Sequence, residues 1–354
     1  AQWHAPGMMV RHSGLGAATA LGAPPALALA LLFAPLGCFF YKLQSRRAGR
    51  RARFALAVPY IHDLQAYADV RRGLAQQQLG GLVATSAGHV ALELLRQIRI
   101  DMRHQEVWGA SVMVLGTVTW NEKQKSRTGR AEVMLRSEAA LTRYARVRSV
   151  LPDRVVPTRD GGRFIAHASS LELFADNLAA GRAIYQGFVE LMNNKDTREF
   201  LGSERKGLSM LVTAEDGILD PQEVAFVEAC HKALSKNYGI AGERAKGESV
   251  DGGARLTKVY ERWRIAFGRA RNLESFRKEL MDFWSRGGAN STLQAQWKVV
   301  LPFLTATRWK HGRDLALLAL ASYARAEAPN ALTNDAAGVD DNNANDAADA
   351  AQGE

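Results

Sequence analysis

The stretch Arg308–Ala324, RWKHGRDLALLALASYA, decides the fold of the carboxyl-terminal part of this sequence. Its first part is basic and contains Trp309, whereas its second part, Leu315–Ala324, is almost wholly apolar. A helix of about ten residues is about 15 Å long, half of the ~30 Å that a bilayer core requires. The stretch therefore predicts a helix in a protein core with its cationic end in water. We expect Thr305 or Thr307 to cap its start.

Three more helices are predicted before this stretch, because apolar residues repeat at helical spacing in three stripes. The stripes run from Leu256 to Ala270, from Leu273 to Trp284 and from Leu293 to Leu304. Short polar breaks at 286–291 and 305–307 favour antiparallel neighbours. The sequence therefore predicts a basic four-helix bundle over residues 254–326.

Residues 166–240 show only a helical pattern. The apolar positions from Leu171 to Leu191 form one amphipathic series, with Gly181 as a weak point. Asp220 before Pro221 is typical of a helix start, since Asp caps free amides and Pro lacks one. We predict that this helix ends near Asn237. Residues 239–253 contain five glycines and are predicted to form a flexible joint.

Residues 1–165 mix strand and helix patterns and predict an α/β body. The runs GCFFYKL (37–43) and RFALAVPYI (53–61) predict a hairpin. Further strands are predicted within 81–86, 107–120 and 131–136, and helices within 62–74 and 89–100. The predicted fold class is thus α+β, a mixed body followed by a mainly helical region that ends in the bundle. Residues 330–354 predict a disordered acidic tail.

The charge of the chain indicates a phosphate-bearing partner. The formal net charge is +10, and the tail carries six acidic residues and no Lys or Arg, which leaves +16 on residues 1–330. A body this basic is typical of proteins that meet nucleic acid or an anionic membrane surface. The alternative is an ordinary solvated basic surface.

Neither a membrane span nor a disulfide is predicted. The apolar run 23–37 is broken by Pro24, Pro25 and Pro35 and is too short for a span, so we expect a buried helix there. Cys38 and Cys230 lack partners at zinc-ligand spacing and are predicted to be reduced packing residues of a cytoplasmic protein.

No catalytic, metal or cofactor site is predicted. Phosphate-binding, dinucleotide-binding, zinc-protease and nucleophile-elbow motifs are absent from the sequence. Pairs of acid–base residues occur, but such pairs are common by chance. They are His62 with Asp63, His89 with Glu93, Asp101 with His104, and His311 with Asp314.

The candidate nucleic-acid-binding residues lie in clusters of Lys and Arg. The loop NEKQKSRTGR (121–130) holds four cations that could reach phosphates, although a solvated hairpin tip is the alternative. Residues 255–325 hold fourteen Lys or Arg against five acids, hence +9. Trp309 is the candidate for base stacking, because its neighbours are polar, while most Trp residues of apolar stripes pack in cores. The candidate nucleic-acid-binding residues are Lys123, Lys125, Arg127, Arg130, Arg262, Arg264, Arg269, Arg271, Arg277, Lys298, Arg308, Trp309, Lys310 and Arg313.

Successive phrases of the sequence resemble one protein family. They are GCFFYKL, RFALAVPYIHDLQAYADVR, VMVLGTVTWNEKQKSRT and WKHGRDLALLALASY, in this order between Leu31 and Ala324. They are similar to the C-terminal portion of the large subunit of type I CRISPR effector complexes (Cascade), in the Myxococcus-subtype family. Members commonly carry a further N-terminal part, which we expect on another chain or outside this sequence.

The resemblance implies a non-catalytic subunit of a multi-subunit ribonucleoprotein complex. Such subunits help recognise and unwind target duplex DNA, stabilise strands and recruit the helicase-nuclease transiently. The implied partners are guide RNA, target DNA, and the backbone and guide-end-capping subunits, with sequence read by guide pairing. The rival hypothesis is a metal-dependent nuclease or other phosphodiester-processing enzyme, which would need Asp101 or Asp314. A membrane-surface protein is a third hypothesis.

Overall fold

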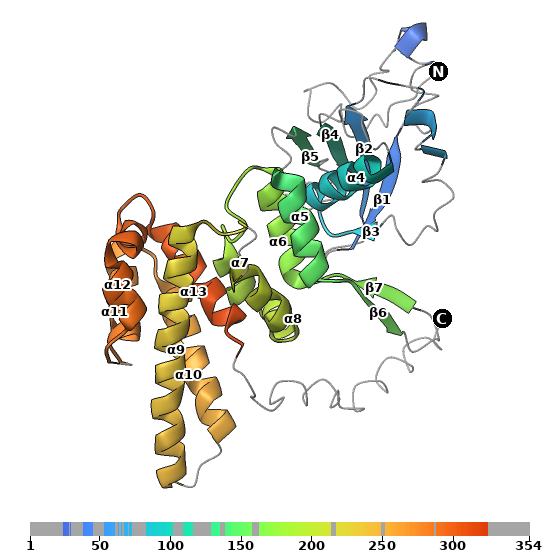
Figure 1. The fold of residues 1–354 in the computed structure, drawn as a ribbon. Coiled ribbons are helices and arrows are strands. Elements are labelled where there is room, and N and C mark those ends of the chain that lie inside the picture. Colours follow the sequence, from blue (N-terminus) through green and yellow to red (C-terminus); the bar gives the residue numbers. More distant parts are fainter. Residues whose placement is uncertain are drawn as a thin grey trace, which may run out of the picture.

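The computed structural model has an α+β fold, as the sequence predicts, and its strands all precede residue 167 (Figure 1). The structure describes residues 24–27, 29, 38–44, 53–60, 63, 65, 67–69, 71–72, 83–101, 109–115, 129–134, 139–157, 163–213, 217–248, 252–286 and 288–324.

A five-stranded sheet in the order β3-β1-β2-β4-β5 forms the amino-terminal body. Its strands are β1 (Phe39–Leu43), β2 (Arg53–Tyr60), β3 (Val83–Ala84), β4 (Gly109–Leu115) and β5 (Gly129–Met134). The antiparallel pairing of β1 with β2 confirms the predicted hairpin. Side chains alternate along β1, where Phe39, Tyr41 and Leu43 are buried and Phe40 is exposed. The buried face packs against helix α4 (Ala87–Asp101).

A second layer joins this body to the helical region. It contains α5 (Ala139–Val150), the hairpin of β6 (Arg154–Pro157) and β7 (Arg163–Ala166), and α6 (Ser169–Ala179). The amphipathic series predicted to be continuous is interrupted after α6. Gly181 and Gly187 have φ angles of 66° and 83°, in the left-handed region that favours glycine. The chain turns there and continues as α7 (Phe188–Asn193) and α8 (Lys195–Thr213).

Helix α9 (Pro221–Glu248) confirms one prediction and corrects another. Asp220 accepts a hydrogen bond from the Glu223 amide, and the Glu223 carboxylate accepts one from the Asp220 amide. This reciprocal capping explains why the helix starts where the sequence predicts. The predicted flexible joint is wrong over residues 239–248, because α9 continues through Gly239 and Gly242.

The four helices predicted for the carboxyl-terminal bundle all form. They are α10 (Gly252–Arg269), α11 (Leu273–Arg286), α12 (Ser291–Val300), which continues into the 3-10 turn η2 (Leu301–Leu304), and α13 (Trp309–Ser322). However, α13 also packs against α7, α8 and α9, and α9 contacts each of the other three (Figure 1). These helices therefore share their core with α7–α9. The domain boundaries drawn from the sequence stay predictions.

Two local predictions are wrong. Neither Thr305 nor Thr307 caps α13 with its side chain: the N-cap residue is Arg308, and the Thr305 hydroxyl donates to the Pro302 carbonyl instead. At 23–37, where a buried helix was expected, Leu27 and Leu29 are exposed, and most of this run lies outside the described residues.

Cys38 and Cys230 are buried free thiols, in agreement with their predicted role in packing. Among the residues that the structure describes, none belongs to a helix that is both long and apolar enough to cross a bilayer.

The close approach of α13 to η2 depends on Gly312. A methyl group at this position would lie 2.6 Å from the carbonyl oxygen of Phe303 and 3.2 Å from the Phe276 ring. Gly312→Ala should therefore destabilise the protein by about 1–3 kcal/mol, as measured by urea denaturation of the full chain. The control is Gly239→Ala, because a methyl group there meets nothing within 4 Å. It should stabilise the protein by about 0.5–1 kcal/mol, and equal effects at both sites would contradict this account.

Candidate nucleic-acid interface

The structure brings part of the predicted cation set together at one end of the carboxyl-terminal helices. Arg269 ends α10, Arg271 lies in the turn before α11, and Lys310 and Arg313 lie in the first turns of α13. The Arg313 guanidinium donates to the Ala270 carbonyl at 3.2 Å, which joins the turn to the start of α13. We call this group the α13 basic end; it consists of Arg269, Arg271, Trp309, Lys310 and Arg313.

Three cations of this group are exposed, whereas the fourth, Arg313, is half-buried and lies 3.4 Å from the Asp314 carboxylate. Arg269, Arg271 and Lys310 are exposed, and within the described part of the chain none of them lies in an ion pair. The nearby acid Asp314 is buried and accepts a hydrogen bond from the Gly187 amide at 2.7 Å. Burial raises the pKa of Asp314, although the amide and Arg313 oppose that effect. Asp314 therefore makes its contacts inside the protein, with Gly187 and Arg313, and does not pair with Arg269, Arg271 or Lys310.

Trp309 holds two of these cations in place. Its ring centroid lies 5.5 Å from the Arg313 guanidinium and 6.0 Å from the Lys310 ammonium, within the range of cation–π attraction. The indole is only partly exposed and packs against the core, where the Phe276 ring lies 6.4 Å away. Trp309 therefore positions charge, and its faces are already in contact with other side chains.

Among the described tryptophans, Trp297 has the most exposed indole, and the sequence pattern did not single it out. Trp297 is 38% exposed on α12, stacks edge-on against Trp284 and precedes the exposed Lys298. The backbone of Gln296 departs from helical geometry, with φ −120° and ψ 23°. The helical spacing of apolar residues in this stretch predicts that Trp297 is buried, so the sequence pattern gave no sign of its exposure.

Other residues that were predicted to bind nucleic acid form contacts within the protein. Arg264 is only 8% exposed and binds the Glu261 carboxylate and the Met192 carbonyl, so its guanidinium is engaged inside the protein and not at the surface where the sequence predicted it. Arg262 shares Asp282 with Arg286. Arg277 donates to the Leu304 carbonyl and Arg308 to the Gln222 side chain.

The basic loop of the body lies largely outside the described residues. Lys123, Lys125 and Arg127 are not described, and Arg130 is placed by its backbone alone, in register with Met113 of β4. The contribution of this loop stays a prediction.

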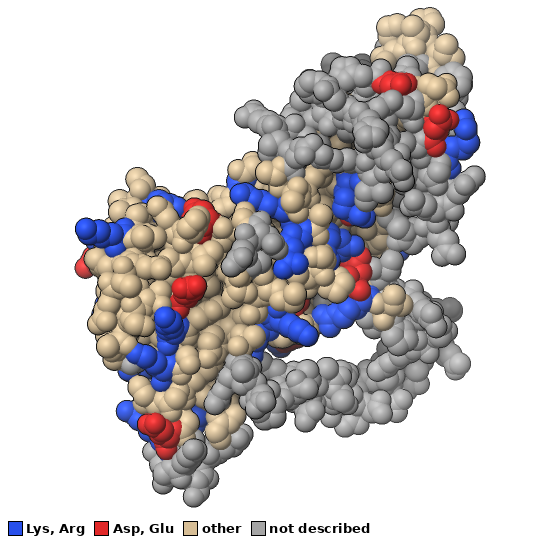
Figure 2. All heavy atoms as spheres, in the orientation of Figure 1, with Lys and Arg blue, Asp and Glu red and all other residues tan. Residues whose placement is uncertain are grey.

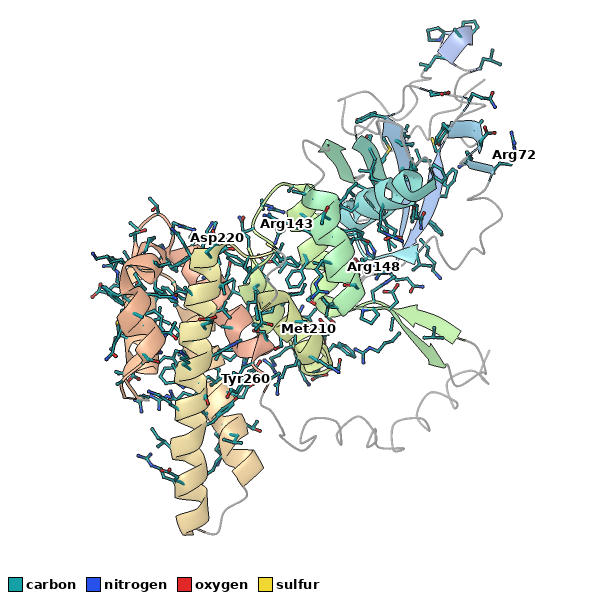
Figure 3. The ribbon with its side chains drawn as sticks, viewed as in Figure 1. Arg72, Arg143, Arg148, Met210, Asp220 and Tyr260 are labelled. Carbon is teal, nitrogen blue, oxygen red and sulfur yellow. The ribbon has the colours of Figure 1, made fainter. Side chains whose placement is uncertain are left out.

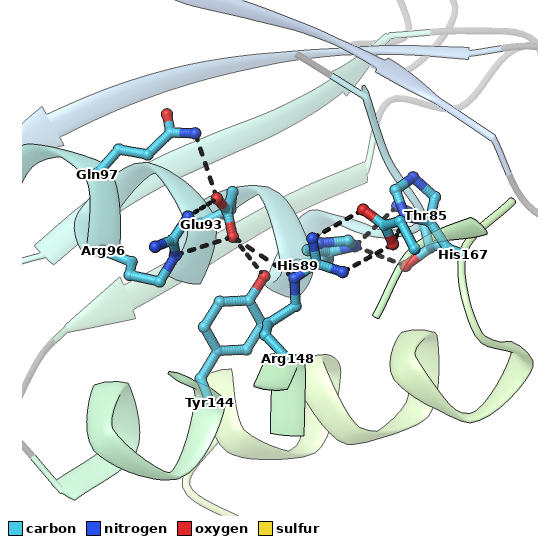
Figure 4. Close-up of polar contacts among 9 residues, drawn as sticks. Thr85, His89, Glu93, Arg96, Gln97, Tyr144, Arg148 and His167 are labelled. Carbon is cyan, nitrogen blue, oxygen red and sulfur yellow. Dashed lines mark hydrogen bonds and ion pairs between the residues drawn. The ribbon is translucent and has the colours of Figure 1, made fainter. Parts of the chain in front are cut away.

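A buried polar network lies between α4, α5 and the β6–β7 hairpin (Figure 4). The Glu93 carboxylate accepts hydrogen bonds from Arg96 at 2.5 Å and from Tyr144 at 2.8 Å. Burial alone would raise the pKa of Glu93, but Arg96 and Tyr144 outweigh burial and lower it. Beside it, Arg148 forms two hydrogen bonds of 2.7 Å with Asp153.

Two histidines complete this network. His167 contacts Asp153 at 2.6 Å through Nδ1, and the His89 ring lies 5.3 Å from that of His167. The His89 Nδ1 accepts from the Thr85 amide. Each charged group thus has a fixed partner inside the protein, an arrangement that ties α4 to α5 and β6.

The rival nuclease hypothesis would need carboxylates such as Asp101 or Asp314 near a metal ion. Among the described residues, no group of three or more His, Cys, Asp or Glu side chains could hold a metal ion. Asp314 is engaged with Gly187, and the side chain of Asp101 is outside the described set. His89 and Glu93, paired in the sequence reading, contact different partners.

Comparison with known proteins identifies the class of protein first. Residues 214–350 match the family described as the DevT C-terminal domain. As its sequence phrases predicted, the chain is also similar to a CRISPR-associated protein. The particular relative is the CRISPR-associated protein Cas8a1/Csx13 of Myxococcus xanthus (strain DK1622), which is 32% identical over 348 residues. The match covers 91% of this chain and 59% of the relative, so the chain spans less than two thirds of that protein's length.

The buried network predicts how stability depends on pH. Burial, helped by His167, lowers the pKa of His89 from 6.5 to about 3. Between these values the unfolded chain binds a proton that the folded chain does not, so stability falls as the pH drops through this window. His89 alone would contribute up to about 1.4 kcal/mol per pH unit.

His89→Asn should therefore flatten the decline of unfolding free energy between pH 6.5 and 4, as measured by urea denaturation at several pH values. His311→Asn, which removes an imidazole from α13, is the matched control and should keep the wild-type slope. A slope in His89→Asn as steep as that of the wild type would contradict the assignment.

Proposed function

We propose that this chain is a non-catalytic, DNA-binding component of a type I CRISPR surveillance complex and that the α13 basic end contacts the phosphates of the target. The observation that carries the proposal is the gathering of exposed, unpaired cations from α10, the following turn and α13 at one place. Phosphate contacts of this kind supply most of the sequence-independent affinity for DNA. Similarity to a CRISPR-associated protein supports the same class of partner.

The position of these cations is unfavourable for the helix itself. Lys310 and Arg313 lie at the amino-terminal end of α13, where the helix dipole is positive, and its first turn has no acid. Like charge at this end costs a few tenths of a kcal/mol for each residue. A bound phosphate would reverse that cost, because anions are favoured at helix amino termini.

In the proposed complex, the chain helps recognise and open the target duplex, holds a separated strand and recruits the helicase-nuclease. Guide RNA and the backbone and guide-end-capping subunits are the proposed partners, and guide pairing supplies sequence specificity. The cations of the loop 121–130 and Lys298 are proposed as further contacts.

The proposal predicts a loss of salt dependence when the charges are removed. The variant Arg269→Gln, Arg271→Gln, Lys310→Gln should weaken DNA binding and reduce the slope of log affinity against log salt by about 2 for single strands and about 3 for duplex. Fluorescence anisotropy of labelled DNA at several salt concentrations measures this slope.

The matched control removes three exposed cations elsewhere, as Arg72→Gln, Lys232→Gln, Lys236→Gln. It should leave most of the slope intact. If the salt slope falls by the same amount in both triple variants, the binding is a non-specific response to net charge. The α13 basic end is then not the contact.

Trp297 is proposed to stack on an unpaired base beside Lys298. Trp297→Leu should weaken single-strand binding by about 1–3 kcal/mol, while Trp297→Phe should retain most of the affinity, since phenylalanine also offers an aromatic face. Unfolding free energies measured in parallel separate a loss of stacking from a loss of stability. Equal binding by the leucine and phenylalanine variants would count against stacking.

A further inference from the structure

A second cationic surface lies away from the α13 basic end, over α5, β6 and α8. Arg143 of α5, Arg154 of β6 and Lys206 of α8 are exposed on it, and Arg146 and Arg205 are partly exposed. Figure 2 shows Lys and Arg side chains over this part of the molecule, and Figure 3 places Arg143 on α5 and Met210 on α8. We call these five arginine and lysine residues the α5–α8 surface.

The fold assembles this surface through a close helix contact. At Gly207 of α8 the absent side chain lets the backbone of Val150, the last residue of α5, approach directly. The guanidinium of Arg154 then reaches across to the Ser203 hydroxyl of α8 at 2.7 Å. Cations that are some 50 to 60 residues apart in the sequence thereby come to lie over one pair of helices.

Two acids of this region are held by internal contacts, whereas a third, Glu199 of α8, is exposed and lies 4.0 Å from Lys195. Helix α5 has three arginines and no acid. Glu204, in the middle of α8, is buried and accepts hydrogen bonds from the Ser169 and Ser170 amides at the start of α6. Asp153 is held by Arg148 and His167. Within the described residues, Arg143, Arg154 and Lys206 form no ion pair, so these three exposed cations are available to a ligand.

The surface continues toward the carboxyl-terminal helices. The Arg205 guanidinium lies 6.0 Å from the ring centroid of Tyr260 on α10. Tyr260 is labelled in Figure 3. Helix α10 in turn ends at Arg269 of the α13 basic end. Phe200 and Met210 are exposed on α8 among these cations.

We propose that the α5–α8 surface binds the sugar-phosphate backbone of a nucleic-acid strand, as a second contact besides the α13 basic end. The exposed cations match the charge of the phosphates, and the apolar side chains between them suit contact with sugars and bases. The inference rests on the proposed function for the kind of partner, but it assigns a different set of residues.

A nucleic-acid strand fits this surface better than a membrane does. Phe200 and Met210 are ten residues apart on α8, about 15 Å along the helix, with the cation Lys206 between them. An interfacial helix would instead present a continuous apolar face to the lipid. Isolated apolar side chains between cations resemble the pattern of strand-binding grooves, which combine stacking with phosphate contacts.

The test compares two triple variants of the full chain by fluorescence anisotropy with a labelled single strand and a labelled duplex. The α5–α8 variant carries Arg143→Gln, Arg154→Gln and Lys206→Gln, and the control is again Arg72→Gln, Lys232→Gln, Lys236→Gln. All six side chains are exposed, so the folding of both variants should be preserved, and circular dichroism checks this. The α5–α8 variant should lower the salt slope for the single strand by about 2, with the control close to wild type.

Several outcomes would separate this inference from the proposed function. If the Arg269, Arg271 and Lys310 variant loses binding while the α5–α8 variant keeps the affinity and slope of its control, the inference is wrong and the proposed function stands. If the wild-type chain binds neither DNA, both are wrong. Binding to a membrane is tested by sedimentation with vesicles of phosphatidylserine and phosphatidylcholine. If the α5–α8 variant loses vesicle binding and keeps its DNA binding, the surface contacts a membrane and the inference is wrong.

Discussion

The burial of α13 is the constraint on which the rest of the helical region depends. Every residue from Leu315 to Ala321 is buried, so this helix must be covered on all sides. Helices α7, α8, α9, α10 and α11 supply that cover, and Gly312 allows η2 to approach as well. The amino-terminal end of α13 is consequently held at a fixed place next to the α10–α11 turn. The backbone beneath the cation cluster is thus held by core packing and by the contact of Arg313 with Ala270, which would lower the entropy cost of the proposed phosphate contact.

The second organising feature is that several carboxylates are held by contacts inside the protein. Asp314, Glu204 and Asp153 are directed into the protein, where each accepts hydrogen bonds from an amide, a hydroxyl or an arginine. Burial of these carboxylates is tolerated because each is paired or hydrogen-bonded. Among the described residues, Arg269, Arg271 and Lys310 remain exposed and form no ion pair.

The titratable residues around Glu93 stabilise the fold, because their hydrogen bonds and ion pairs join neighbouring elements. Glu93, Tyr144 and Arg148 come from α4 and α5, and their contacts join the sheet body to the second layer. Two of the acid–base pairs noted in the sequence, His89 with Glu93 and His311 with Asp314, form no hydrogen bond with each other, since His89 bonds to Thr85 and Asp314 to Gly187. The other two pairs lie partly outside the described residues. This architecture accords with a subunit whose proposed role is to hold and position nucleic acid.

The sequence by itself determined the class of fold, the starts and faces of most helices and the similarity to a CRISPR-associated protein. Periodicity and the capping by Asp220 are local, so they are readable without a structure. The tertiary structure alone decided which cations are available: Arg264 is buried against Met192, whereas Arg269, Arg271 and Lys310 stay exposed around the contact of Arg313 with Ala270. It also decided that Trp297 is open while Trp309 is packed, and that α9 runs through Gly239. These outcomes depend on neighbours that are distant in the sequence, and a local pattern carries no information about such contacts.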